Sequence, residues 1–177
     1  MKRGAALAVP LVNGAAPSPT IGEVDEFPVY DRISYSVPQA AELVGMPTTL
    51  IRARYLYGDY NLYFAGDSRG KPLIRSVDLL PWAEAFEAAK TKAADTGAQW
   101  WECFIFDPME APPVYSFISC SLEEAARRTG VSSKLIAAAR ARGDLTAHYA
   151  GEKQGKAVYR AADLDAWIMS LPTDRGW

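Results

Sequence analysis

The sequence predicts a mainly helical α+β fold in which one small unit occurs twice. A shift of 85 residues, from Ser36 to Ser121, aligns Ser36 to Glu84 with Ser121 to Met169 without a gap. Each repeat contains two short helix-forming stretches that end at glycines. Each then has two apolar stretches around a polar, glycine-bounded loop, which is the pattern of a β-hairpin. The repeat is too long for a solenoid unit and suits two small domains in tandem.

A capping box and a stop signal predict the first helix of each repeat. Ser36 with Gln39, and Ser121 with Glu124, have the spacing at which a serine oxygen accepts an amide hydrogen and the longer side chain reaches back. A glycine follows nine residues after each serine, where a left-handed residue ends a helix. Both first helices are therefore expected to be short.

A second helix follows at once in each repeat. It begins at Thr48 after Pro47 in the first repeat, and at Ser133 after Ser132 in the second, and these residue types suit a helix start. A glycine again ends each helix. Paired alanines in each first helix let the second helix cross it closely, so the two helices form a helix-turn-helix motif.

A hairpin and a last helix complete each repeat. The stretches "LYFAGDSRGKPLIR" and "AHYAGEKQGKAVYR" each read as strand, polar loop and strand, with basic residues at the loop. Asp78 and Asp163 then begin helices that carry Trp82 and Trp167 as expected core residues. The predicted order is helix, turn, helix, hairpin, helix.

The segment between the repeats combines a helix with an aromatic stretch. Residues 82–96 are strong helix formers, so the last helix of the first repeat is expected to continue to a stop at Gly97. The stretch "WWECFIF", Trp100 to Phe106, is strand-like, and the prolines after it exclude a helix. We expect this apolar stretch to pack between the two units and fix their orientation; the alternative is an interface with another chain.

Composition excludes several function classes. Nineteen basic and 21 acidic side chains give a net charge of -2, so any anion-binding surface must be local. Cys103, Cys120 and the single His148 are too few for a usual zinc site, and no metal or cofactor is expected. No window is apolar enough to cross a bilayer. No nucleophile with a neighbouring base and no P-loop spacing is present, so an enzyme is not expected.

The two helices at the start of each repeat resemble those of a known family. "YSVPQAAELVGMPTTLIRARYLYGDY" and "CSLEEAARRTGVSSKLIAAARARGDL", each followed by a hairpin and a "DL..W" helix, resemble the excisionase-like, MerR-like winged helix-turn-helix domain of phage and bacterial regulators. The resemblance covers about Ser34 to Phe86 and Ser119 to Leu171. It implies that the second helix enters the major groove of DNA and that the hairpin, or wing, touches the adjacent backbone or minor groove.

The resemblance sets the expected domain boundaries. They are a flexible N-terminal tail at 1–33, winged helix-turn-helix domains at 34–86 and 119–171, a connector at 87–118, and a C-terminal tail at 172–177. The short apolar run near the N-terminus contains Pro10, so a flexible tail is favoured over a secretory signal. Together with the low cysteine count, this predicts a cytoplasmic protein, and the resemblance implies a bacterial host cell and association with the nucleoid.

The resemblance also selects candidate DNA-binding residues. In the first repeat they are Thr48, Thr49 and Arg52 on the second helix, with Arg69 and Lys71 in the wing. In the second repeat they are Ser133, Lys134, Arg140 and Arg142 on the second helix, with Lys153 and Lys156 in the wing. Arg52 is the best candidate for a bidentate guanine contact, worth about 1–3 kcal/mol of discrimination. The alanine-rich helix of the second repeat is expected to contact mainly phosphates and thymine methyl groups. The alternative for Arg75 and Arg160 is pairing with Asp78 and Asp163 within the fold, so these two arginines are left out of this set.

These residues predict a non-enzymatic, double-stranded DNA-binding regulator. It would be either a transcription repressor or an excisionase-like architectural factor, with a recombinase or another protein as a second candidate partner. It would act as a monomer with two modules or as a homodimer. The alternative is a protein-interaction or assembly module that reuses the winged-helix fold, with Trp100 to Phe106 as its binding surface.

Overall fold

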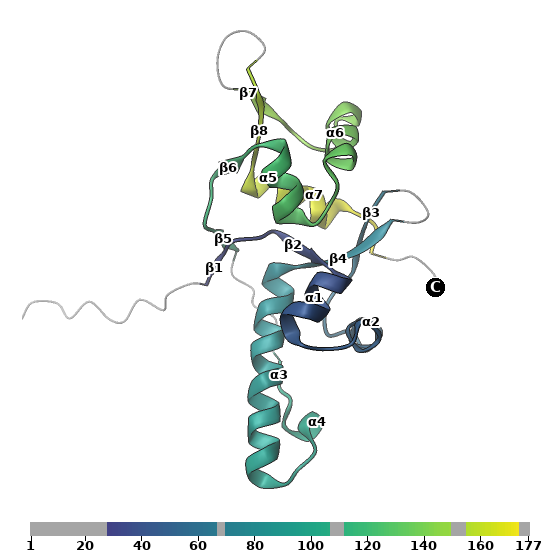
Figure 1. Cartoon of the computed structure of the whole chain (residues 1–177), viewed down its shortest axis with the longest axis vertical. Helices are drawn as coiled ribbons and strands as arrows, with labels where there is room; N and C mark the ends of the chain where they lie inside the picture. Colours follow the sequence, from purple (N-terminus) through teal and green to yellow (C-terminus); the bar gives the residue numbers. More distant parts are fainter. Residues whose placement is uncertain (1–27, 67–69, 107–111, 150–154, 174–177) are drawn as a thin grey trace, which may run out of the picture.

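The computed structural model describes residues 28–66, 70–106, 112–149 and 155–173. A mainly helical α+β fold is confirmed, and one order of elements occurs twice (Figure 1). We call residues 29–96 copy 1 and residues 114–170 copy 2, and residues 85 apart are equivalent. Copy 1 contains β1 (Val29–Tyr30), β2 (Ser34–Ser36), α1 (Val37–Val44), α2 (Thr48–Leu56), β3 (Tyr63–Ala65), β4 (Lys71–Arg75) and α3 (Ser76–Thr96). Copy 2 contains β5 (Val114–Tyr115), β6 (Ser119–Cys120), α5 (Leu122–Thr129), α6 (Ser133–Arg142), β7 (His148–Tyr149), β8 (Ala157–Arg160) and α7 (Ala161–Ser170). The helix α4 (Trp100–Cys103) lies between them.

The predicted capping signals begin and end the first helices. The backbone N–H of Ser36 donates to Oε1 of Gln39 at 3.0 Å, and the backbone N–H of Glu124 donates to Oγ of Ser121 at 3.2 Å. These bonds satisfy amide groups that the first turn leaves without a helical partner. A left-handed glycine follows the last residue of both α1 and α5. Two short helices separated by a left-handed glycine are therefore present in both copies.

The small sheets also repeat residue for residue. The strand order is β2-β4-β3 in copy 1 and β6-β8-β7 in copy 2, with antiparallel neighbours in both. Ser34 pairs with Arg75, and their equivalents Ser119 and Arg160 pair in the same way. The hairpins β3–β4 and β7–β8 are thus held against the strand that precedes each first helix.

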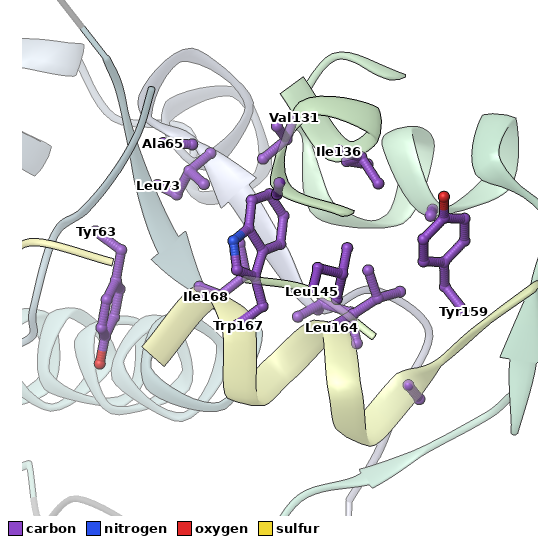
Figure 2. Close-up of a cluster of buried hydrophobic side chains, with 14 of the residues drawn as sticks. Tyr63, Ala65, Leu73, Val131, Ile136, Leu145, Tyr159, Leu164, Trp167 and Ile168 are labelled. Carbon is purple, nitrogen blue, oxygen red and sulfur yellow. The ribbon is translucent and has the colours of Figure 1, made fainter. Parts of the chain in front are cut away.

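Two apolar clusters form the core, and one of them joins the copies. The first lies within copy 1 around Ile51, Leu79 and Trp82. The second is centred on α5, α6 and α7 of copy 2 but includes Leu73 and other side chains of copy 1. Figure 2 shows Leu73 of this cluster with Trp167 of α7. The two units therefore share a core, unlike two domains on a flexible linker.

The predicted N-terminal tail is wrong for residues 28–33. β1 pairs in parallel with β5, with Val29 opposite Val114 and Tyr30 opposite Tyr115. Tyr30 is 3% exposed and Ile33 is fully buried. The stretch looks like a tail in sequence because its pairing partner lies 85 residues away. The rest of the predicted tail lies outside the described residues.

The connector was predicted correctly in its helix and wrongly in its aromatic stretch. α3 runs to Thr96 and ends at Gly97 as expected. Trp100 then begins the four-residue helix α4 where a strand was predicted. Its indole packs edge-on against Phe86 of α3, with 5.0 Å between ring centroids, and Phe104 approaches Trp82 at 6.1 Å. The aromatic stretch therefore covers the core of copy 1 and does not fix the two copies relative to each other. Among the described residues, no helix has the length and apolar character needed to cross a membrane.

Candidate nucleic-acid interface

Direct contacts between the copies set the relative position of the second helices. The backbone N–H of Ile33 donates to the carbonyl of Arg128 at 2.9 Å. The hydroxyl of Ser34 donates to the carbonyl of Thr129 at 2.6 Å. The start of β2 in copy 1 therefore lies along the C-terminal end of α5 in copy 2. We call this contact surface the junction.

A buried ion pair crosses the junction. Arg75 donates from Nε and Nη2 to the two carboxylate oxygens of Asp165, each at 2.9 Å, and both side chains are largely buried. The expectation that Arg75 pairs with Asp78 within its own copy is wrong as to the hydrogen-bond partner. Asp78 lies close enough to act on Arg75 electrostatically, and burial raises the pKa of the Asp78 carboxyl. A bidentate pair of this kind fixes both distance and angle.

The equivalent arginine of copy 2 has a different setting. Arg160 is exposed, and Asp163 is hydrogen-bonded to Nε2 of His148 at 2.7 Å. The expected pairing of Arg160 with Asp163 is therefore also wrong. Asp165, the partner of Arg75, has Leu80 as its equivalent in copy 1. The ion pair at the junction thus belongs to the contact between copies and not to the repeated unit.

The predicted residues of α2 are exposed. Thr48 and Thr49 lie in its first turn and Arg52 one turn later, while Ile51 is fully buried and holds the helix on the core. Another face of α2 is covered: Arg54 bonds to Asp59 at 2.6 Å and lies beneath the aromatic rings that follow α3. The aromatic stretch therefore leaves the predicted reading face of α2 open.

The predicted residues of α6 are exposed as well. Ser133 and Lys134 lie in its first turn, and Arg140 and Arg142 lie in its last turn. Nε of Arg142 contacts Asp144 at 2.7 Å, but both side chains are well exposed. An exposed pair of this kind contributes about 0–1 kcal/mol, so Arg142 can exchange this partner for another anion at little cost.

The junction brings cations of both copies to neighbouring depressions. Hairpin β3–β4 lies between α2 and α6 (Figure 1). Lys71, the first residue of β4, lines one depression of about 380 Å³ together with Arg52. Lys71 also lines a second depression, of about 590 Å³, together with Arg142 and Leu135 of α6. A hairpin expected to serve its own helix thus stands beside the second helices of both copies.

The remaining wing residues are not part of this grouping. Lys156 is exposed and directly precedes β8. Hairpin β7–β8 projects in a different direction from hairpin β3–β4 (Figure 1). Arg69 and Lys153 lie outside the described residues.

Gly130 is a residue of this region that sequence reasoning did not place at the junction. Gly130 lines both depressions beside Lys71 and stands against the start of α1 in copy 1. Its equivalent, Gly45, has open space around it. Both glycines end a first helix in the same way, so nothing in their local sequence distinguishes the one at the junction.

Within the described ranges, no group of three or more His, Cys, Asp or Glu side chains could hold a metal ion. Cys103 and Cys120 are free thiols, and burial raises the pKa of Cys120 to about 11. No family model, no curated protein and no solved structure matches the chain.

Proposed function

We propose that the chain is a non-enzymatic regulatory protein that binds double-stranded DNA through two winged helix-turn-helix units. It would act as an excisionase-like architectural factor or as a transcription repressor. The exposed outer faces of α2 and α6, with hairpin β3–β4 between them, support this proposal. A second helix is the element that such units insert into the major groove.

One observation carries the proposal: Lys71 lines one depression with Arg52 and another with Arg142. Three cations from both copies therefore border adjoining hollows in a chain whose net charge is -2. A local cluster of this kind can neutralise phosphates although the whole protein is weakly acidic. In this proposal Arg52, on the exposed face of α2, would meet base edges, and Lys71, on hairpin β3–β4, would meet the backbone.

The junction adds a mechanical argument. Because the copies share a core and a buried ion pair, α2 and α6 are presented at one fixed separation. A rigid pair of weak reading heads binds more tightly than either head alone, because the second contact is intramolecular. A duplex that does not match their spacing must deform to reach both, and its flexibility would then contribute to specificity.

The test is duplex binding measured by fluorescence anisotropy over a series of salt concentrations. Lys71→Ala should weaken binding to all duplexes and lower the slope of log K against log salt by about 1, since one phosphate contact is lost. Arg52→Ala, tested on duplexes selected from a random pool, should cost about 1–3 kcal/mol and relax the preference at one base pair. Lys92→Ala is the matched control, because Lys92 is an exposed cation in the last turns of α3. That end of α3 lies far from hairpin β3–β4 (Figure 1).

Two results would count against DNA binding. One is a wild-type chain that fails to bind duplexes at low salt. The other is an equal loss of affinity for Lys92→Ala and Lys71→Ala, which would indicate attraction by overall charge.

A protein-assembly role is the alternative, and exposed apolar side chains favour it. The aromatic stretch supplies two of them, Trp101 at 58% and Ile105 at 80% exposed. Leu43 and Ile118 are 51% and 86% exposed on other faces. A chain that does not bind duplex DNA at low salt but associates with another protein or with itself would support this role.

A further inference from the structure

The two copies meet head-to-tail: copy 1 contributes its β2 side to the junction and copy 2 contributes its α5 side. The equivalent β6 side of copy 2 and α1 side of copy 1 therefore remain uncovered. In the junction, Ile33 at the β2 side of copy 1 bonds to Arg128 at the α5 side of copy 2. In the part of the chain that the structure describes, the reverse contact is absent: Ile118, the equivalent of Ile33, is 86% exposed, and Leu43, the equivalent of Arg128, is 51% exposed. A two-fold contact would have covered both sets. The junction is therefore heterologous, and such a contact can repeat between molecules.

The free face of copy 2 already has the geometry of the used face of copy 1. The carbonyl of Ile33 accepts from the backbone N–H of Ser76 at 2.9 Å. The carbonyl of Ile118 accepts from the backbone N–H of Ala161, the equivalent residue, at 3.0 Å. The isoleucines thus hold the same backbone position, but Ile33 is fully buried and Ile118 projects into solvent.

The free face of copy 1 is an apolar depression at the equivalent place. Four residues of copy 2 form its side of the junction through hydrogen bonds, the ion pair and the shared apolar cluster: Arg128, Thr129, Asp165 and Ile168. The equivalents of these residues in copy 1 are Leu43, Val44, Leu80 and Ala83. All four line one depression of about 430 Å³ between α1 and α3. The surface of copy 1 that is equivalent to the junction surface of copy 2 is therefore an apolar depression.

Charge matches across these two faces. At the junction, Arg75 reaches across to a carboxylate of copy 2. Its equivalent Arg160 is exposed on the free face of copy 2. The depression on copy 1 has Leu80 in place of that carboxylate, but Glu84 and Glu87 lie on its lining. An arginine brought there in the manner of Arg75 would face two acidic side chains. One of them, Glu87, already pairs with Lys90 at 2.9 Å, but both side chains are exposed, so that pair contributes only about 0–1 kcal/mol.

We propose that molecules of this protein bind one another head-to-tail. Ile118 and Arg160 of one molecule would lie in the depression lined by Leu43, Leu80 and Ala83 of the next molecule. Each such contact leaves one free face at either end, so assemblies grow with concentration beyond a dimer. The contact between chains lacks the covalent tether of the internal junction, so it is the weaker of the two. This assembly does not require DNA.

The test is sedimentation velocity on the full chain without DNA, over a series of protein concentrations. The average mass of the wild type should rise past that of a dimer. Ile118→Arg and Leu43→Arg should each lower the association constant at least about tenfold, because an arginine would be buried against apolar groups. A mixture of the two variants keeps one intact pair of faces, so it should form a species that stops at the dimer.

The control is Ile105→Arg, which changes a side chain that is 80% exposed and lies outside both faces. It should leave association unchanged, and thermal unfolding should show that all three variants fold like the wild type. The proposal fails if the wild type stays monomeric or stops at a dimer. It also fails if the mixed variants remain monomeric, or if Ile105→Arg weakens association as much as Ile118→Arg. Loss of DNA binding alone would leave it intact.

Discussion

Gly130→Ala is expected to destabilise the chain more than Gly45→Ala, although the two glycines are equivalent. Their φ angles are +69° and +68°, so an alanine at either position has the cost of a left-handed residue, about 1–2 kcal/mol. Their surroundings differ. A Cβ at position 45 meets nothing within 4 Å, whereas one at position 130 would lie 3.0 Å from Oε1 of Gln39 and 3.2 Å from the backbone nitrogen of Ser36.

The extra cost at position 130 follows from these two neighbours. Oε1 of Gln39 accepts the backbone N–H of Ser36, so displacing it disrupts the cap of α1, which is worth about 0.5–2 kcal/mol. The nitrogen of Ser36 is backbone and moves away only if the junction opens. Overpacking of this kind typically costs about 1–3 kcal/mol. We therefore expect Gly130→Ala to lower the free energy of unfolding by about 1–3 kcal/mol more than Gly45→Ala does.

Urea unfolding followed by tryptophan fluorescence and by circular dichroism measures this difference. Coincident transitions by the two probes would establish that each variant unfolds in one step. Because both variants carry the same left-handed alanine, the strain of that conformation cancels in the comparison. Equal losses, within about 0.5 kcal/mol, would refute the inference that the turn between α5 and α6 is packed against copy 1.

Two further predictions concern the charges around the junction. Arg75→Met leaves Asp165 buried without its partner and should cost about 3–5 kcal/mol in urea unfolding, while Arg75→Met combined with Asp165→Leu should recover most of that loss. Hydrogen bonding from Arg127 is the largest of the effects that lower the pKa of Glu124, from 4.5 to about 2. A carboxyl with a depressed pKa in the folded state contributes stability above its unfolded pKa and loses it as the pH falls, so stability should decline from pH 4.5 toward pH 2. Glu124→Gln should flatten that decline in acid titrations, and an unchanged profile would contradict the assignment.

Much of the local structure could be predicted from the sequence. The serine caps, the glycine stops and the apolar spacing are signals carried within a few residues, and they correctly predicted where α1, α5 and α6 begin and end. α2 begins at Thr48 as predicted, but it ends at Leu56 with a right-handed cap at Tyr57, before the predicted stop at Gly58. The strong helix formers after Trp82 correctly extended α3 to Gly97. The exposed positions of Arg52 and Lys134 follow from the same periodicity, because the buried face of a short helix determines the opposite one.

The tertiary structure decided what lies against these elements. β1 pairs with β5, and Arg75 forms an ion pair with Asp165, although these partners are 85 and 90 residues apart. Trp100 packs on Phe86 of α3, a contact that the strand-like residues around Trp100 did not indicate. Ile33 and Ile118 make the point most directly. Both precede a short strand and hold the same backbone hydrogen bond, yet one is fully buried and the other is 86% exposed. Local sequence determines the backbone geometry of a residue, but its burial depends on which surface is placed against it, and only the packing of the two copies decides that.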